Sequence, residues 1–173
     1  MRKGIDVEEY ILRQLYHTYQ KEIYLYLFAL CRNKDLAEDL MQETFMKAIL
    51  SLADSHTNMR AWLYMVARNL YFNHRKKEGR NVPLDSIQDS FEDSSFDIHE
   101  GVIADERKRF LYNALQHLSD LKREILTMQY YGDLSQKEIA ALLRLTPENV
   151  RILAYRGRKE LRLILEENGY DIS

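Results

Sequence analysis

Apolar side chains recur at helical spacing along most of the chain. Between Asp6 and about Asn33 this spacing predicts one long helix, or two in series. A second helix is expected over residues 35–52, where one continuous apolar stripe comprises Ala37, Leu40, Met41, Thr44, Phe45, Ala48 and Leu52. Asn58 can cap a third helix, which continues to about Lys77. Its core side is predicted to comprise Trp62, Met65, Val66, Asn69, Leu70 and Asn73, with Tyr64, Tyr71 and Phe72 on its surface.

The second half of the chain shows the same spacing in shorter pieces. Two amphipathic helices are predicted between residues 110 and 128. Ser135 and Glu138 form a capping-box pattern at the start of the next helix. After a short turn, Thr146 can cap a further helix, and Pro147 fits its first position because no backbone N–H is needed there. Two helices at this distance predict a helix-turn-helix.

Composition agrees with helices throughout. The chain has 173 residues with 2 prolines and 6 glycines, which favours an all-α fold, and it is long enough for one domain or two small ones. Residues 85–106 are rich in Asp and Glu and contain no Lys or Arg, which is typical of an unstructured linker. We therefore expect one helical domain over 5–82, an acidic flexible linker over 83–106 and a second helical domain over 107–168.

The cellular compartment is indicated by what the sequence contains. A single cysteine, Cys31, excludes an internal disulfide and suits a reducing environment. There is no signal-peptide pattern and no apolar run near 18 residues. The sequence predicts a cytoplasmic location.

Charge is distributed unevenly, although the net charge is only −2. The chain is therefore not a generally basic protein of the kind that coats nucleic acids. The outward face of the second predicted helix carries acids and no base, in the set Asp35, Glu38, Asp39, Gln42 and Glu43. A solvated face, helped by the helix dipole near its start, is the interpretation that the pattern alone favours. The alternative is a docking surface for a basic partner, whereas the absence of histidine from the cluster argues against a metal site.

Two further faces are basic. The third predicted helix ends in cations interleaved with aromatic rings, a combination typical of proteins that bind single strands, although cations suit any helix C-terminus. On the second helix of the helix-turn-helix, Val150, Ala154, Gly157, Leu161 and Ile164 are expected to face the core. The opposite side carries Glu148, Arg151, Ile152, Tyr155, Lys159 and Arg162, flanked by Arg156. This face suits the DNA major groove, and a solvated basic face is the alternative that the stretch itself leaves open.

Taken together, these segments resemble a bacterial extracytoplasmic-function (ECF) sigma factor of the sigma-70 family. The matching stretches are DLAEDLMQETFMKA, RAWLYMVARN with the basic stretch after it, the acidic linker, and LSQKEIAALLRLTPENVR with YRGRKEL. The resemblance covers nearly all of Ile11–Leu165. It implies that the first domain is sigma region 2 and the second is sigma region 4.

The resemblance also implies a role for each surface. Core-polymerase binding falls on Asp35, Glu38, Asp39, Gln42 and Glu43, which replaces the solvated-face interpretation. Recognition and melting of the −10 promoter element fall on Arg68, Asn69, Asn73, Arg75, Lys76, Lys77 and Arg80, with a structural role near the core side as the alternative for Asn69. Binding of the −35 element falls on Glu148, Arg151, Ile152, Tyr155, Arg156, Arg158, Lys159 and Arg162.

The sequence departs from the family pattern in two places. Ile152-Leu153 stands where the family usually has a small polar residue and then an arginine, which changes the expected −35 sequence; an outward Ile152 suits a thymine methyl group. Arg144 stands where the turn usually has glycine. The sequence therefore predicts either an unfavourable φ at Arg144 or a slightly different turn.

The resemblance implies a transcription initiation factor with no catalytic residues, no cofactor, no metal site and no small-molecule substrate. Its expected partners are core RNA polymerase, promoter DNA and an anti-sigma factor, which in this family is often membrane-anchored. Two alternatives are a helix-turn-helix regulator that binds DNA without core polymerase and a helical adaptor that binds only proteins. No Gly-rich phosphate loop and no nucleophile–base pair points to an enzyme.

Overall fold

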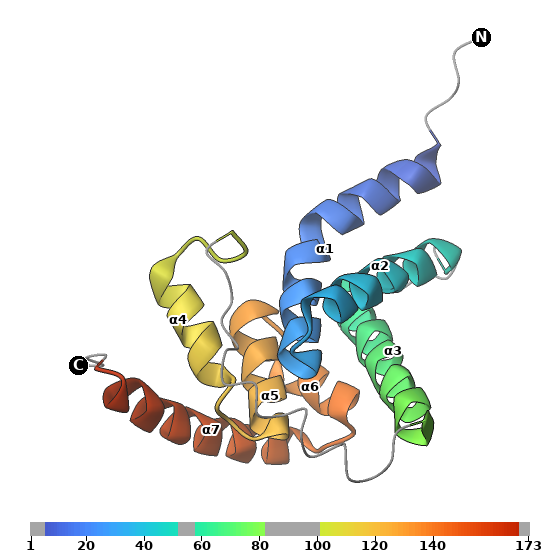
Figure 1. Ribbon diagram of the computed structural model, residues 1–173. Helices are drawn as coiled ribbons and strands as arrows, with labels where there is room; N and C mark the ends of the chain where they lie inside the picture. The colour runs from blue at the N-terminus through green and yellow to red at the C-terminus, as the bar shows by residue number, and fades with distance from the viewer. Residues whose placement is uncertain (1–5, 52–57, 82–100, 170–173) are drawn as a thin grey trace. The chain divides into compact units, whose positions relative to one another are not determined.

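The structure is a computed structural model that describes residues 6–51, 58–81 and 101–169. Every regular element within these residues is an α-helix (Figure 1). The chain divides into two compact units, Met1–Lys76 and Lys77–Ser173. The predicted all-α fold with two helical parts is confirmed.

The first unit begins with helix α1, Val7–Cys31, which is a single helix and not two in series. The Asp6 side chain caps its start by accepting a hydrogen bond from the Glu8 amide at 3.1 Å. The helix ends at Arg32, which has a left-handed φ of 51°. All residues from Ile23 to Leu30 are buried, so this half is enclosed on every side, as expected for a helix that is apolar all round.

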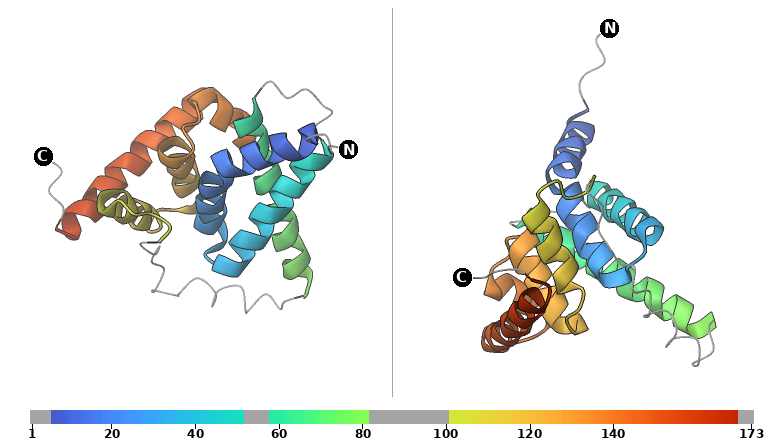
Figure 2. Two further views of the ribbon diagram at one scale, coloured as in Figure 1. Left: turned by 90° about the horizontal axis from the view of Figure 1, so that it is seen from above. Right: turned by 60° about the vertical axis from the view of Figure 1, so that its left-hand side comes forward.

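Helix α2, Lys34–Leu50, follows after two residues and packs along α1 (Figures 1 and 2). Asn33 caps it by accepting a hydrogen bond from the Leu36 amide at 3.0 Å. The predicted stripe is confirmed at its described positions, which are the buried residues Ala37, Leu40, Met41, Thr44, Phe45 and Ala48. The buried hydroxyl of Thr44 donates to the Leu40 carbonyl oxygen at 2.7 Å, so it is satisfied inside the core. Leu52 lies outside the described residues.

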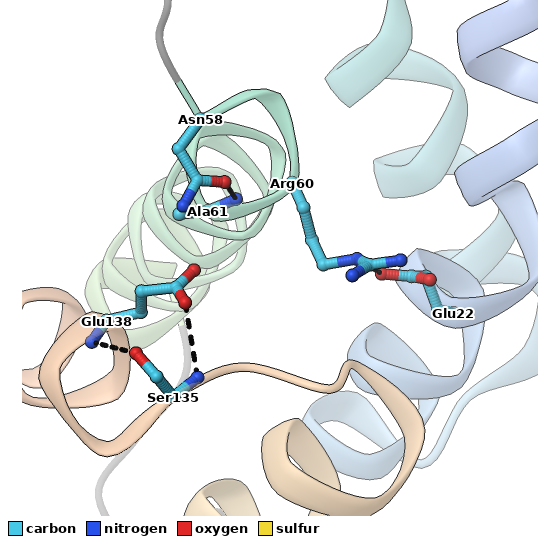
Figure 3. A network of polar contacts seen from close by, with 6 residues as sticks. All are labelled: Glu22, Asn58, Arg60, Ala61, Ser135 and Glu138. Atoms are coloured by element: carbon cyan, nitrogen blue, oxygen red, sulfur yellow. Dashed lines mark hydrogen bonds and ion pairs between the residues drawn. The ribbon is translucent and has the colours of Figure 1, made fainter.

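Helix α3, Met59–Asn81, starts as predicted at Asn58, whose side chain accepts a hydrogen bond from the Ala61 amide at 3.1 Å (Figure 3). The prediction of its core side was mostly wrong, because of the six predicted residues only Leu70 is buried. The buried residues are Leu63, Tyr64, Ala67, Leu70 and Tyr71. Of the residues expected to face the core, Met65, Asn69 and Asn73 are exposed, and of those expected on the surface, Tyr64 and Tyr71 are buried.

Contacts with α1 explain this orientation of α3. The rings of Tyr26 and Tyr64 meet with centroids 5.0 Å apart, and the Tyr71 hydroxyl donates to the Leu30 carbonyl oxygen at 3.1 Å. Near the start of α3, Arg60 forms a salt bridge with Glu22 at 3.1 Å (Figure 3). Burial raises the pKa of Tyr64 well above its usual range. These contacts fix which side of α3 faces outward.

The second unit contains α4 (Glu106–Leu115), α5 (Asp120–Tyr131), α6 (Gln136–Leu143) and α7 (Pro147–Glu167). The long helix α7 packs against the other three helices (Figure 2). The Asp105 side chain caps α4, and the backbone N–H groups of Lys108 and Arg107 lower its pKa. The core is formed by Tyr112, Leu115, Ile125, Leu126, Met128, Ile139, Val150 and Ala154.

Helices α6 and α7 form the predicted helix-turn-helix. Ser135 and Glu138 make a complete capping box, with side chain to backbone hydrogen bonds of 3.1 and 3.3 Å (Figure 3). Thr146 caps α7 by accepting a hydrogen bond from the Asn149 amide at 3.1 Å. Between them Arg144 has a φ of 54°. This departure from glycine therefore places a side chain in the left-handed region, which is unfavourable for an L-residue.

A close approach holds α7 against α5. A Cβ atom built on Gly157 would lie 3.0 Å from Cδ1 of Leu126 and 3.4 Å from Cβ of Lys122. A side chain at this position would therefore require its neighbours on α5 to move by a few tenths of an ångström. The side chains of Lys122 and Glu160 also form a salt bridge across this pair of helices. The position and orientation of α7 depend on this contact.

Replacing Arg144 with glycine should stabilise the helix-turn-helix by about 1 kcal/mol, because glycine adopts a left-handed φ without steric cost. The free energy of opening, measured by amide hydrogen exchange in α6 and α7 of the full chain, reports the change. Ala141→Gly is the matched control, because Ala141 is exposed within the regular part of α6. That substitution should destabilise by about 1 kcal/mol. Destabilisation by both variants would contradict the turn geometry.

Candidate DNA-binding and polymerase-binding surfaces

The acidic face of α2, defined as Asp35, Glu38, Asp39, Gln42 and Glu43, lies opposite the buried stripe of that helix. Glu38 is half-buried and the other four residues are exposed. No salt bridge joins any of these side chains to another residue of the described parts of the chain. Burial and then the negative charge of Glu38 raise the pKa of Tyr24. The face therefore combines exposed negative charge with few compensating cations.

An apolar hollow lies beside the acidic face. It has a volume of about 710 Å³ between the N-terminal half of α1 and the C-terminal half of α2. Its lining includes Leu12, Tyr16, Phe45, Met46 and Ile49, together with Gln42 of the acidic face. The rings of Tyr16 and Phe45, which both line it, form an edge-to-face pair with centroids 5.1 Å apart. Gln42 thus links a charged surface to an apolar one.

The outward surface of α3 combines amides, cations and an aromatic ring. Asn69, Asn73, Arg75, Lys76 and Lys77 are exposed. Because Asn69 is exposed, the expectation that it lies near the core side of α3 is wrong.

Arg68 is half-buried, and its guanidinium carbon lies 4.5 Å from the centroid of the Phe72 ring. This cation–π contact orients the guanidinium along the helix surface. Arg80 is within α3, but its side chain lies outside the described part of the structure.

The outward surface of α7 carries all the residues predicted for it. Val150, Ala154, Gly157 and Leu161 are buried against the second unit. The exposed residues on the other side are Glu148, Arg151, Ile152, Tyr155, Arg156, Lys159 and Arg162, and Arg158 is exposed at the edge of the buried stripe. The Lys159 ammonium lies 5.6 Å from the centroid of the Tyr155 ring.

Arg151 and Glu148 are paired only loosely, at 3.8 Å, and both are well exposed. Such a surface pair contributes little stability. These polar side chains are therefore available to a ligand at small energetic cost.

Other kinds of site have little support among the described residues. No group of three or more His, Cys, Asp or Glu side chains there could hold a metal ion. None of the described helices is both long enough and apolar enough to cross a membrane.

Two family models match the two units. The model of sigma-70 region 2 matches residues 15–81 and that of sigma-70 region 4 matches residues 110–161. The chain is similar to the ECF RNA polymerase sigma factor SigM of Bacillus subtilis, with 29% identity over 87% of this chain and 93% of that protein. It is also similar to the RNA polymerase sigma factor YlaC of the same organism, with 29% identity over 87% of this chain and 90% of that protein.

The chain belongs to the ECF class of the sigma-70 family. It is an RNA polymerase sigma factor, and a DNA-binding regulator that works without core polymerase is not favoured.

A solved structure supports the same assignment. The sigma factor RpoE of Bartonella quintana, solved in complex with the anti-sigma factor NepR, matches with a TM-score of 0.70 and 25% identity over 89% of this chain and 96% of that one.

The structure of this sigma factor adds one residue to the candidate surface of α3. Met65 is 42% exposed and lies one turn before Asn69 on the side that also carries Asn73. The sequence already indicates that Met65, Asn69 and Asn73 share one side of the helix, because they are spaced at i, i+4 and i+8. The prediction placed Met65 on the core side together with Asn69 and Asn73, because spacing groups these residues without showing whether their side faces the core or solvent.

Proposed function

We propose that this sigma factor binds core RNA polymerase through α2, opens promoter DNA with α3 and reads duplex DNA with α7. It has no catalytic activity of its own and acts in the cytoplasm. The domain boundaries are residues 5–82 for region 2, 83–106 for the linker and 107–168 for region 4. The observation that carries the proposal is that three charged surfaces lie on three different helices, each opposite a buried side.

The acidic face of α2 is the proposed core-binding surface. Its partner is a basic helical surface of the polymerase, because exposed carboxylates attract cations and steer association. Gln42 joins this face to the apolar hollow, so a matching partner surface places an apolar side chain next to its basic ones. That combination of charge and apolar burial is typical of specific protein interfaces.

The outward surface of α3 is the proposed −10 surface. The side chains of Arg68, Arg75, Lys76 and Lys77 neutralise phosphates, while the amides of Asn69 and Asn73 can bond to the edges of bases. Separation of two strands loses stacking and pairing, so charge and base contacts are needed together. The exposed positions of Asn69 and Asn73 beside these cations support the assignment. Arg80 belongs to this surface by its place in the sequence.

The outward surface of α7 is the proposed −35 surface. Helix-turn-helix proteins insert the second helix into the major groove with its first turns at the base edges. Glu148, Arg151, Ile152 and Tyr155 occupy those first turns, and Arg156 flanks them. Arg158, Lys159 and Arg162 lie further along the helix and contact phosphates, which position the protein without reading sequence.

We also propose an anti-sigma factor as a regulatory partner. The similar sigma factor RpoE was solved in complex with an anti-sigma factor, and it matches this chain over both units. A run-off transcription assay with purified core polymerase tests the function as a whole. Transcripts starting at defined promoter sites are expected only when this chain is added, and their absence would refute the proposal.

Charge reversal on α2 should weaken core binding. Asp39→Lys together with Glu43→Lys is expected to lower affinity for core polymerase by more than about tenfold, because attraction to a basic surface becomes repulsion. Fluorescence anisotropy of the labelled chain with core polymerase measures the affinity. Glu8→Lys with Glu9→Lys is the matched control, because these exposed acids lie in the first turn of α1. Equal losses in the two variants would mean that only net charge matters.

Loss of two lysines on α3 should impair strand opening. Lys76→Ala with Lys77→Ala removes two exposed cations next to the amide surface, so less charge is available to hold separated strands. Permanganate reactivity of unpaired thymines in the polymerase–promoter complex should fall, while binding to closed duplex is retained. Lys21→Ala with Lys108→Ala removes the same charge elsewhere and should leave reactivity unchanged. Normal reactivity in the Lys76/Lys77 variant would remove this surface from melting.

Two arginines of α7 should behave differently. Arg151→Ala is expected to cost about 1–3 kcal/mol for one preferred base and to relax specificity there, as expected for loss of a bidentate contact. Arg158→Ala should weaken all promoter sequences alike, because phosphate contacts carry no sequence information. Binding of the reconstituted holoenzyme to a panel of upstream-element variants distinguishes these results. A uniform loss with Arg151→Ala would make it a phosphate contact.

A further inference from the structure

Ile152 is an aliphatic residue on the side of α7 that points away from the core. With about 100° of rotation per residue, it lies about 170° from the centre of the buried stripe of α7, which comprises Val150, Ala154, Gly157 and Leu161. Its side chain is 36% exposed. Its neighbours at i−4, i−1, i+3 and i+4 are Glu148, Arg151, Tyr155 and Arg156. A single apolar side chain is therefore surrounded by polar ones on the outward surface.

Folding of the second unit does not account for isoleucine at this position. A β-branched residue gains nothing in helix propensity over a polar straight-chain residue. It also keeps 36% of its surface exposed, so packing within the folded chain leaves part of its apolar surface unused. The position is two residues beyond the buried Val150, which holds the start of α7 in the core. The choice of residue is therefore better explained by a ligand than by packing.

The chemistry of the major groove limits what such a side chain can recognise. Base pairs present hydrogen-bond donors and acceptors there, and one apolar group, the 5-methyl of thymine. Isoleucine has no hydrogen-bonding group, so it discriminates bases only through that methyl group. Arg151 and Glu148, on the same turn, can bond to guanine and cytosine edges respectively. These three side chains therefore distinguish different bases by different chemistry.

We propose that Ile152 is a specificity-determining residue that contacts the 5-methyl group of one thymine in the upstream promoter element. The inference rests on the proposed entry of α7 into the major groove. Because the neighbours of Ile152 are polar, Ile152 is the side chain in the first turns of α7 that makes an apolar contact with the base. The preferred upstream element therefore contains a thymine close to the base that Arg151 contacts.

Leu163 provides a matched comparison. It is 60% exposed and lies on nearly the same side of α7, eleven residues further along. That separation corresponds to about 16 Å along the helix axis at 1.5 Å per residue. Leu163 is therefore an exposed aliphatic residue beyond the turns that face the base edges. Its substitution controls for general loss of apolar surface.

The experiment uses thymine and uracil, which differ only in the methyl group. Holoenzyme reconstituted from core polymerase and the full chain first selects tight-binding duplexes from a pool randomised across the upstream element. Each thymine of the selected element, on either strand, is then replaced in turn by uracil. With the natural chain, one replacement should weaken binding about fourfold, the factor expected from loss of one buried methyl group. With Ile152→Ser, thymine and uracil should bind equally at that position, whereas Leu163→Ser should retain the fourfold difference.

The outcomes separate the inference from the proposed function. If the natural holoenzyme depends on the upstream sequence but tolerates uracil at every position, the role of Ile152 is refuted and reading by α7 stands. If Ile152→Ser keeps the fourfold difference, another side chain contacts the methyl group and the inference is again refuted. If the upstream sequence has no effect on binding, the assignment of α7 to the −35 element fails as well. Because Ser and Ile have similar helix propensities, the fold of α7 should be unchanged, which circular dichroism checks.

Discussion

The segregation of each helix into a buried side and a charged side determines what this sigma factor can present to its partners. When one side packs into a core, the opposite side is fixed outward without any dedicated scaffold. The acidic face of α2 is exposed because Ala37, Leu40 and Phe45 are buried. The basic surface of α7 is exposed because Gly157 lets that helix approach α5 closely. The contacts that pack each helix into a core therefore also orient its charged side. If this packing were lost, the charged side chains would no longer form continuous surfaces.

Helices α2 and α7 could be predicted well from the sequence because their two sides differ strongly. In α2 the described apolar positions follow one stripe, and in α7 the core side contains Val150, Ala154 and Leu161 with charges opposite. Three caps could also be predicted, because Asn58, Ser135 and Thr146 accept the backbone hydrogen bonds that their residue types suggest. The cap of α2 by Asn33 was not predicted. Local chemistry was sufficient wherever one side of a helix was clearly apolar.

Helix α3 could not be oriented in this way, and the reason is physical. Residues 62–66 are apolar or aromatic in a continuous run, so periodicity gives no unique buried side. The choice is made by partners far away in the sequence: Tyr26 for Tyr64, and the Leu30 carbonyl for Tyr71. Such pairs are invisible to a pattern along one segment. The consequence for the candidate site is large, because the same rotation brings Met65, Asn69 and Asn73 to the surface.

The turn before α7 contains a residue in an unfavourable backbone conformation, next to the helix that is proposed to bind DNA. Arg144 occupies a left-handed conformation that glycine would adopt without strain. The capping box of α6 and the Thr146 cap of α7 stabilise the helices on either side, so the turn is held in place although its own residue disfavours it. An arginine there also adds a cation next to the start of α7.

The charge distribution explains why one chain would need both of the proposed DNA-binding surfaces. A net charge of −2 gives no general attraction to DNA, so each basic surface must act locally within a Debye length of about 8–10 Å. Few phosphate contacts per surface mean weak binding that salt readily disrupts. Tethering on one polymerase turns the second contact into an intramolecular event and raises the overall affinity without new contacts. With α2 as the proposed core-binding surface, the chain is expected to bind promoters tightly only after it has joined the enzyme, so that free chains do not occupy promoters unproductively.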